Sequence, residues 1–151
     1  MKNFILLFLL SLIVSACNKQ EEVDFPFDNS KFYENHEAAN WTKETAKEHL
    51  QGRWMLIYTY CCPMSENRGW KSVEEDFFVL QFEQDSVKVF KNSTLEQTQY
   101  WEFNDQNEES LHLETEELIS NTFGTIYFYE DFMLFNGSPL DGPDNYFQKV
   151  K

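Results

Sequence analysis

Apolar and polar residues alternate with a period of two along most of the chain beyond residue 52, which is the pattern of half-buried β-strands. In residues 53–60 this alternation places Trp54, Leu56 and Tyr58 on one face. Similar patterns predict strands over residues 76–83, 87–91, 94–103, 110–114, 122–129, 132–135 and 145–150. About eight short strands, with connections too short for crossover helices, predict an all-β fold built as an antiparallel sandwich or barrel.

A single short helix is expected in front of these strands, over residues 43–50. Thr42 is suited to cap its N-terminus, and Trp41 can pack against Ala46 as a hydrophobic staple. Gly52 suits the position just past the end of the helix, where a left-handed backbone is common. The pattern therefore predicts an all-β domain with one short N-terminal helix.

The start of the chain follows a different pattern. Residues 4–14 are apolar except for Ser11, and Lys2 provides a cationic start. This apolar run is shorter than the ~18 residues that a membrane-spanning helix needs. The small residues of Val14-Ser15-Ala16 then precede Cys17, and this arrangement resembles the lipobox of bacterial lipoprotein signal peptides.

The lipobox resemblance implies that residues 1–16 are a signal peptide that is removed. It also implies that the thiol of Cys17 receives a diacylglycerol and the freed amine a further acyl chain such as palmitate. Several acyl chains on one residue give stable membrane anchoring, whereas a single chain binds reversibly. The protein is thus expected to be lipid-anchored in the bacterial outer membrane, on its periplasmic or cell-surface face.

The residues that follow Cys17 predict a tether. Residues 18–22, Asn-Lys-Gln-Glu-Glu, resemble the surface-export signal found in lipoproteins of one Gram-negative phylum, although a plain solvated tether fits almost as well. Residues 31–41 carry no clear pattern. The expected organisation is a signal peptide over residues 1–16, a lipidated cysteine with its tether over residues 17–41, and one barrel domain over residues 42–151.

Composition narrows the possible interior and partners. Aromatic residues make up 17% of the chain, so the core is expected to be rich in Phe, Tyr and Trp. The formal net charge is -14, and no Lys or Arg occurs between Asn92 and Gln148. Such a surface repels nucleic-acid phosphates and anionic lipids, so nucleic acid is not expected as a partner. A cationic protein is compatible with this charge, and so is mere solubility.

Cys61 and Cys62 are the cysteines left once Cys17 is lipidated. An envelope location permits disulfides, so a vicinal disulfide or two packed thiols are the expected states. Together with Met64 they could offer soft sulfur ligands to copper(I). No metal site or other cofactor is expected, because the three histidines are scattered at positions His36, His49 and His112.

Gly52-Arg53-Trp54, placed at the start of the first strand and just after a short helix, resembles the Gly-x-Trp signature of lipocalins. The layout as far as a last strand at residues 146–151 resembles the small lipocalin-like domains of Gram-negative lipoproteins. The resemblance implies an antiparallel eight-stranded barrel in which Trp54 plugs the closed end. It also implies that a basic residue near the C-terminus, Lys149 or Lys151, packs on the Trp54 ring. The other lipocalin motifs are not recognisable.

An eight-stranded barrel is either filled by side chains or just wide enough for one small ligand. We therefore expect a module that binds a small apolar or amphipathic ligand. The alternative is an acidic interaction or protective lipoprotein that binds a cationic partner, such as a lysozyme-like enzyme or an antimicrobial peptide. No nucleophile motif, phosphate loop or metal spacing suggests an enzyme. The expected ligand-binding residues are Tyr58, Phe78, Leu80, Trp101, Tyr127 and Phe132.

Overall fold

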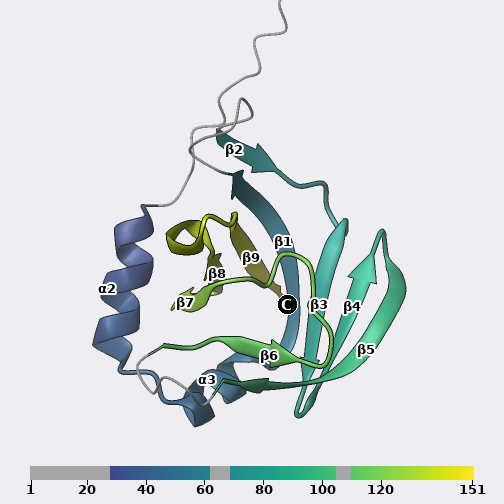
Figure 1. The fold of residues 1–151 in the computed structure, drawn as a ribbon, viewed down its shortest axis with the longest axis horizontal. Coiled ribbons are helices and arrows are strands. Elements are labelled where there is room, and N and C mark those ends of the chain that lie inside the picture. Colours follow the sequence, from purple (N-terminus) through teal and green to yellow (C-terminus); the bar gives the residue numbers. More distant parts are fainter. Residues whose placement is uncertain (1–27, 62–68, 105–109) are drawn as a thin grey trace, which may run out of the picture.

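The computed structural model describes residues 28–61, 69–104 and 110–151, and these residues form two helices, nine strands and one short 3₁₀ turn. The strands are β1 (Gly52–Cys61), β2 (Gly69–Ser72), β3 (Phe78–Glu83), β4 (Ser86–Lys91), β5 (Thr94–Phe103), β6 (Leu113–Thr115), β7 (Thr125–Tyr129), β8 (Phe132–Asn136) and β9 (Asp144–Val150). Eight of them pair in the order β6-β5-β4-β3-β1-β9-β8-β7, and β2 pairs with β1 outside this path (Figure 1).

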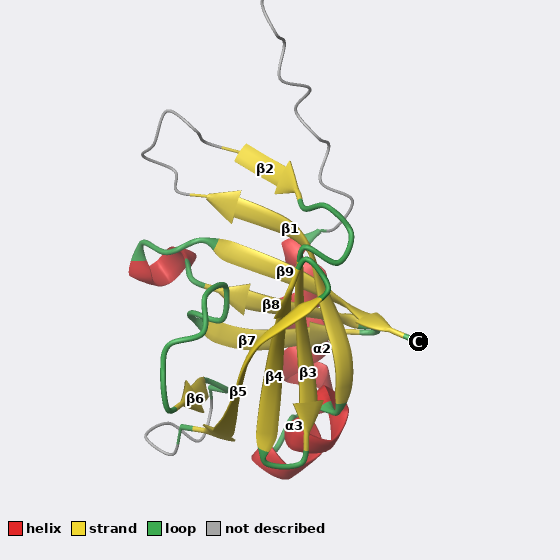
Figure 2. Cartoon of the chain, turned by 90° about the vertical axis from the view of Figure 1, so that its right-hand side faces the viewer, coloured by secondary structure: helices red, strands yellow, loops and turns green. Residues whose placement is uncertain are grey.

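The sheet curls into an antiparallel, nearly closed eight-stranded barrel, which confirms the predicted fold class (Figures 1 and 2). All named strand pairs are antiparallel. The two ends of the strand order meet just before β6, where His112 and Thr125 form an isolated bridge. The Ile126 backbone N–H also donates to the Leu111 carbonyl oxygen at 2.8 Å. These contacts join β7 to the segment that leads into β6.

Each predicted strand is present, although most of the ends differ by one to three residues, and one strand was missed. The bounds of β5 are those predicted, while β6 covers residues 113–115 where 110–114 was expected. β2 was not predicted, because four residues are too few to show an alternating pattern. The barrel can thus be recognised from periodicity, but its shortest strands cannot.

Helix α3 (Lys43–Leu50) has the predicted bounds and closes one end of the barrel. Thr42 caps it as expected: its Oγ1 accepts the Thr45 backbone N–H at 3.2 Å, and Thr45 Oγ1 accepts the Thr42 N–H at 3.0 Å. Leu50 is fully buried and belongs to the core inside the barrel. The chain leaves the helix through Gly52, whose φ of +108° few other residues adopt.

Helix α2 (Asn29–Ala39) corrects the expectation of a tether as far as residue 41. The helix packs against the outer face of the barrel beside β7 (Figure 1). Phe32 is fully buried there, with ring centroids 5.8 Å from Tyr129 and 5.9 Å from Tyr146. The sequence does not reveal this helix because Phe32 is its only buried residue, which is too little for an amphipathic pattern. The expected signal peptide, Cys17 and the first part of the expected tether lie outside the described residues.

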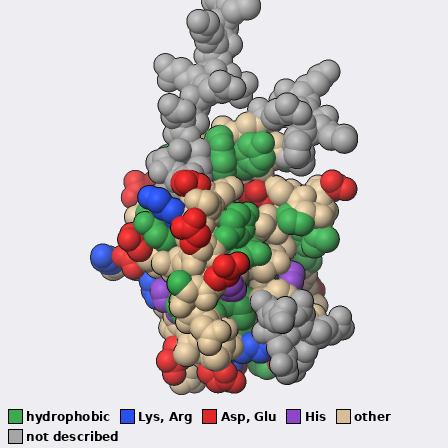
Figure 3. All heavy atoms as spheres, turned by 90° about the vertical axis from the view of Figure 1, so that its left-hand side faces the viewer, with side chains coloured by type: hydrophobic (Ala, Val, Ile, Leu, Met, Phe, Trp, Pro, Cys, Tyr) green, Lys and Arg blue, Asp and Glu red, His purple; other side chains and the backbone are tan. Residues whose placement is uncertain are grey.

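The apolar side chains form two clusters on opposite faces of the same strands. The inner cluster lies inside the barrel and includes Trp54, Phe128 and Phe147. The outer cluster lies between the barrel and α2, and its fully buried members are Phe32, Leu134 and Tyr146. Some hydrophobic side chains remain visible among acidic ones on the face that carries α2 (Figure 3). Within the described residues, no helix has the length and apolar character needed to span a membrane.

Candidate functional site

The inward-facing side chains change character along the barrel, from large and apolar near α3 to small and polar at the other end. The pairing of β1 with β9 shows this change in three successive inward pairs. These are Trp54 with Lys149, Leu56 with Phe147, and Thr59 with Asn145. Directly opposed residues of an antiparallel pair point to the same face of the sheet. β1 runs away from α3, so Thr59 and Asn145 lie farther from the helix than Leu56 and Phe147.

The end near α3 is sealed around Trp54. The ring is fully buried, and its Nε1 donates a hydrogen bond to the Leu50 carbonyl oxygen at 2.7 Å. The Lys149 ammonium lies 5.1 Å from the centroid of this ring and donates to the His49 carbonyl oxygen at 2.6 Å. The expected cation–π contact is therefore present and is made by Lys149. Lys151 instead pairs with Asp131 on the surface, at 3.1 Å.

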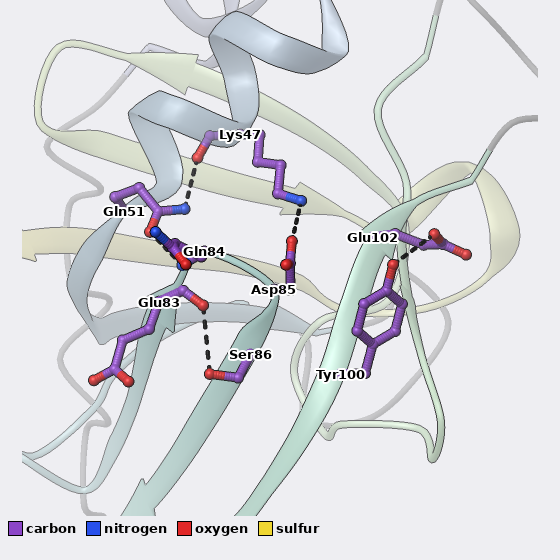
Figure 4. Close-up of polar contacts among 8 residues, drawn as sticks. All are labelled: Lys47, Gln51, Glu83, Gln84, Asp85, Ser86, Tyr100 and Glu102. Atoms are coloured by element: carbon purple, nitrogen blue, oxygen red, sulfur yellow. Dashed lines mark hydrogen bonds and ion pairs between the residues drawn. The ribbon is translucent and has the colours of Figure 1, made fainter.

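Polar contacts on the outside fasten α3 to the hairpin between β3 and β4 (Figure 4). Lys47 Nζ lies 2.6 Å from Asp85 Oδ1, and Gln51 Oε1 accepts the Gln84 backbone N–H at 2.7 Å. The Gln51 amide also donates to the Lys47 carbonyl oxygen at 3.0 Å. Because side-chain and backbone contacts hold the helix at this end, a ligand would enter from the opposite end.

Aromatic rings fill the interior next to the sealed end. Phe147 packs edge-on against Phe78 and Phe135, with centroids 6.2 and 5.6 Å away. Phe82 packs in the same manner against Trp101 at 5.1 Å. All five rings are at most 1% exposed. A ligand inside the barrel would therefore lie beyond the Phe147 layer, on the side away from α3.

Asn145 is the unusual residue of that side. It is 0% exposed, and neither its Nδ2 nor its Oδ1 has a hydrogen-bond partner among the described residues. Thr59 and Phe135 are its cross-strand neighbours on β1 and β8. Leaving one buried polar group unsatisfied costs about 1–3 kcal/mol, so an amide with both groups unpaired needs an explanation. Its place opposite Phe135 puts this amide on the inward face of β9.

The structure does not bring the six expected ligand-binding residues together. Phe78, Leu80 and Trp101 belong to the inner cluster, and all three are fully buried. The other three, which pack against the outer cluster, are Tyr58, Tyr127 and Phe132. A common pocket wall made of these six residues is therefore wrong, because the wall of the barrel separates the two sets.

A β-bulge explains the error at Tyr58. The register of β1 against β9 shifts between Leu56 and Tyr58, so the side chains beyond the bulge exchange faces. Tyr58 therefore pairs with Tyr146 on the outer face, while Thr59 points inward. Regular alternation cannot predict a bulge. Tyr127 was assigned to the wrong face for another reason. The outer face of β7 packs against α2 and is apolar like the inner face, so the sequence does not show which face points inward.

Asn145 was not predicted as a site residue. It lies two positions before the inward-facing Phe147, which is the only signal that the sequence offers. A polar residue at the start of a strand usually faces solvent. The spacing alone therefore does not identify Asn145 as buried unless the pairing of β9 with β1 and β8 is known.

The scattered histidines and the cysteine pair offer no alternative centre within the described residues. No three His, Cys, Asp or Glu side chains in the described ranges lie close enough to hold a metal ion. His36 packs against Tyr127 and His49 against Trp41, each with ring centroids 5.0 Å apart. Cys61 is half-buried at the end of β1, whereas Cys62 lies outside the described residues. The vicinal disulfide therefore stays a prediction.

Comparisons with known proteins leave the function to be argued from this geometry. No protein-family model, curated protein or solved structure matches the chain.

Proposed function

We propose that this chain is a lipid-anchored lipoprotein of the bacterial outer membrane whose barrel binds one small apolar or amphipathic ligand at the end away from α3. The observation that carries the proposal is the difference between the two ends of the barrel. Trp54, Lys149 and α3 seal one end, whereas Thr59 and Asn145 give the other end small, polar inward side chains. A site closed at one end lets a ligand bury its apolar part and keep its polar part near the entrance.

The anchor is the part of the proposal that rests on the sequence. The short apolar run followed by Val14-Ser15-Ala16 supports acylation of Cys17. Mass spectrometry of the membrane fraction should find a chain that begins at an acylated Cys17. A Cys17→Ala variant should lose both the acyl groups and the cleavage. An uncleaved N-terminus in the unaltered chain would contradict the anchor and leave the ligand site untouched.

The energetics of the site favour a small ligand. Phe135 and Phe147 supply aromatic surface next to Asn145, and burying apolar area contributes roughly 25 cal/mol per Å². An eight-stranded barrel is wide enough for one small molecule at most. We therefore expect an occupant the size of a single substituted ring or a short alkyl chain.

Blocking the entrance tests the binding site. Thr59→Trp places a large ring on the inward face, and Thr98→Trp places the same ring on the exposed outer face of β5 as a matched control. Acetophenone binding, measured by calorimetry on the full chain in detergent, should weaken at least ten-fold in Thr59→Trp and stay unchanged in Thr98→Trp. Partition of acetophenone into detergent is the same for both variants. Equal affinity of the two variants would show that the barrel is not the site.

One observation favours the second candidate function, the binding of a cationic protein. Glu102 and Glu114 lie directly opposite each other on β5 and β6, and like charges in that arrangement repel. A basic partner such as lysozyme would relieve this repulsion. Its binding should weaken steeply as salt rises to physiological strength, where the screening length falls to about 8 Å, whereas acetophenone binding should not change.

A further inference from the structure

We infer that Asn145 binds the polar group of the ligand, and that this group is uncharged and both donates and accepts a hydrogen bond, as a carboxamide or a lactam does. The inference rests on the proposed function and adds the chemical class of the ligand. It is carried by a fully buried amide at the end of the barrel away from α3, both of whose polar groups lack a partner among the described residues.

The position of the Asn145 side chain is fixed by the strands on both sides. β9 lies between β1 and β8, and Asn145 pairs with Thr59 on one side and Phe135 on the other. Its neighbour Tyr146 points outward, where its hydroxyl donates to Asn29 Oδ1 at 2.9 Å. Because successive side chains of a strand point to opposite faces, the Asn145 amide cannot leave the interior without breaking the register.

The two buried polar residues next to Asn145, namely Asp144 and Asn136, both have hydrogen-bond partners. The Asp144 carboxylate accepts hydrogen bonds from the Ser138 backbone N–H at 2.9 Å and from the Ser138 hydroxyl at 2.8 Å. Asn136 Nδ2 donates to the Tyr33 hydroxyl at 3.2 Å. Both residues are buried, as Asn145 is. Asn145 is therefore a polar residue that this end of the barrel holds in place with no hydrogen-bond partner in the described part of the chain.

The inward neighbours of Asn145 on three strands offer no counter-ion to a charged ligand group. Its inward neighbours on β1, β8 and β9 are Thr59, Phe135 and Phe147, and none of these carries a charge. Lys149, the inward-facing cation of β9, lies at the sealed end and is bonded to the His49 carbonyl. A carboxylate or an ammonium would lose its hydration here without gaining a counter-ion. A neutral group with one donor and one acceptor can pair with both atoms of the Asn145 amide.

Three probes of nearly the same shape test this assignment. Benzamide offers a donor and an acceptor, acetophenone replaces the amine by a methyl group, and benzoate is anionic. The unaltered full chain should bind benzamide at least ten-fold more tightly than acetophenone, and benzoate least tightly, because only benzamide pairs with both groups of Asn145. Asn145→Leu should abolish the preference for benzamide, while Asn136→Leu should retain it.

Stability distinguishes a ligand-binding role from a structural one. Asn145→Leu removes two unsatisfied groups, so the midpoint of urea unfolding should stay the same or rise in the absence of ligand. Asn136→Leu removes a hydrogen bond that the fold uses, so its midpoint should fall. A marked fall in Asn145→Leu would assign the amide a structural role and overturn the inference.

The outcomes separate the inference from the proposed function. Equal affinity of the unaltered chain for benzamide and acetophenone, with both lost in Thr59→Trp, would overturn the inference and leave the ligand site in place. If neither probe distinguishes the unaltered chain from Thr59→Trp, the ligand site itself is wrong. The comparison of probes on the unaltered chain needs no variant that might fail to fold.

Discussion

The two aromatic clusters lie on opposite faces of the same strands, yet they differ in one residue type. The outer cluster contains five tyrosines: Tyr58, Tyr60, Tyr127, Tyr129 and Tyr146. The inner cluster, among the described residues, contains none and consists of Phe, Trp and aliphatic side chains. The chain has seven tyrosines in all, so their distribution between the faces is one-sided.

The difference follows from where a hydroxyl can find a partner. A phenol buried among rings on every side would leave its hydroxyl unsatisfied. In the outer cluster a hydroxyl can reach water or α2, as that of Tyr146 reaches Asn29. The inner face of the barrel wall is thus an apolar core without tyrosine, and the outer face is a partly exposed layer of tyrosines. Among the described residues of the inner face, buried polar atoms without a partner occur at Trp101 Nε1 and at both groups of Asn145.

The largest expected effect is on the inner face. Trp54→Ala should lower the free energy of unfolding by about 3–5 kcal/mol, because it removes a fully buried ring and its hydrogen bond to Leu50. The matched outer variant is Trp70→Ala, since Trp70 is half-buried and packs against Tyr60 at 4.7 Å. Urea unfolding should show less than half the loss for Trp70→Ala. Equal losses of unfolding free energy would mean that a ring in the outer cluster stabilises the fold as much as a fully buried one.

Adding a hydroxyl to each face tests the comparison more directly. Phe147→Tyr should cost about 1–3 kcal/mol of stability, because the added hydroxyl meets rings and finds no partner. Phe132→Tyr adds the same hydroxyl to the half-buried outer face and should be close to neutral in the same unfolding measurement. A neutral Phe147→Tyr would show that the interior can accommodate a polar atom beside Phe147.

Removing a hydroxyl from the outer face should have a smaller effect. Tyr146→Phe deletes the hydrogen bond to Asn29 and should cost about 0.5–1.5 kcal/mol. The loss should vanish when Asn29 is already alanine, because the two residues form one interaction. An undiminished loss in that double-mutant cycle would place the partner of Tyr146 elsewhere.

The smallest expected effect is a pH dependence that both faces share. Burial lowers the pKa of His49, and the nearby Lys149 charge lowers it further, while Asp131 opposes this. Burial also lowers the pKa of His36, with Glu37 opposing. The unfolded chain therefore binds protons first as pH falls below about 6.5, the ordinary histidine value, and stability declines from there.

Replacing each histidine in turn shows how much of the loss of stability at acidic pH is due to His49 and how much to His36. Unfolding in urea at pH 7.5 and at acidic pH should show a weaker pH dependence for His49→Gln and for His36→Gln than for the unaltered chain. The reduction should be larger for His49, because a cation lies beside it. A chain that gains stability as pH falls through this range would contradict both assignments.

Strong local patterns made part of this fold predictable. β5 and α3 have their predicted bounds because a long alternation and a capped helix are visible in a single segment. The bulge near Ile57 is not visible, since it depends on how β1 pairs with β9, and it moved Tyr58 to the outer face. α2 escaped prediction because it contributes only Phe32 to the buried surface.

The candidate site was less predictable than the fold. Trp54 could be assigned from its place after the helix, because that place is local. Asn145 could not be assigned, because its lack of partners is a property of the assembled barrel. Sequence patterns identify residues by their type and spacing. Asn145 stands out only in the folded barrel, where a polar side chain lies buried without a partner among the described residues.

The contact between Asn29 and Tyr146 would have a mechanical consequence under the proposed anchoring through Cys17. A pull on the tether would reach the folded domain at the start of α2, where Asn29 is bonded to Tyr146 and Phe32 is enclosed by rings. Through this contact the force would reach β9 next to Asn145, as well as α3 along the chain. Tension on such an anchor would therefore reach the strand that carries Asn145.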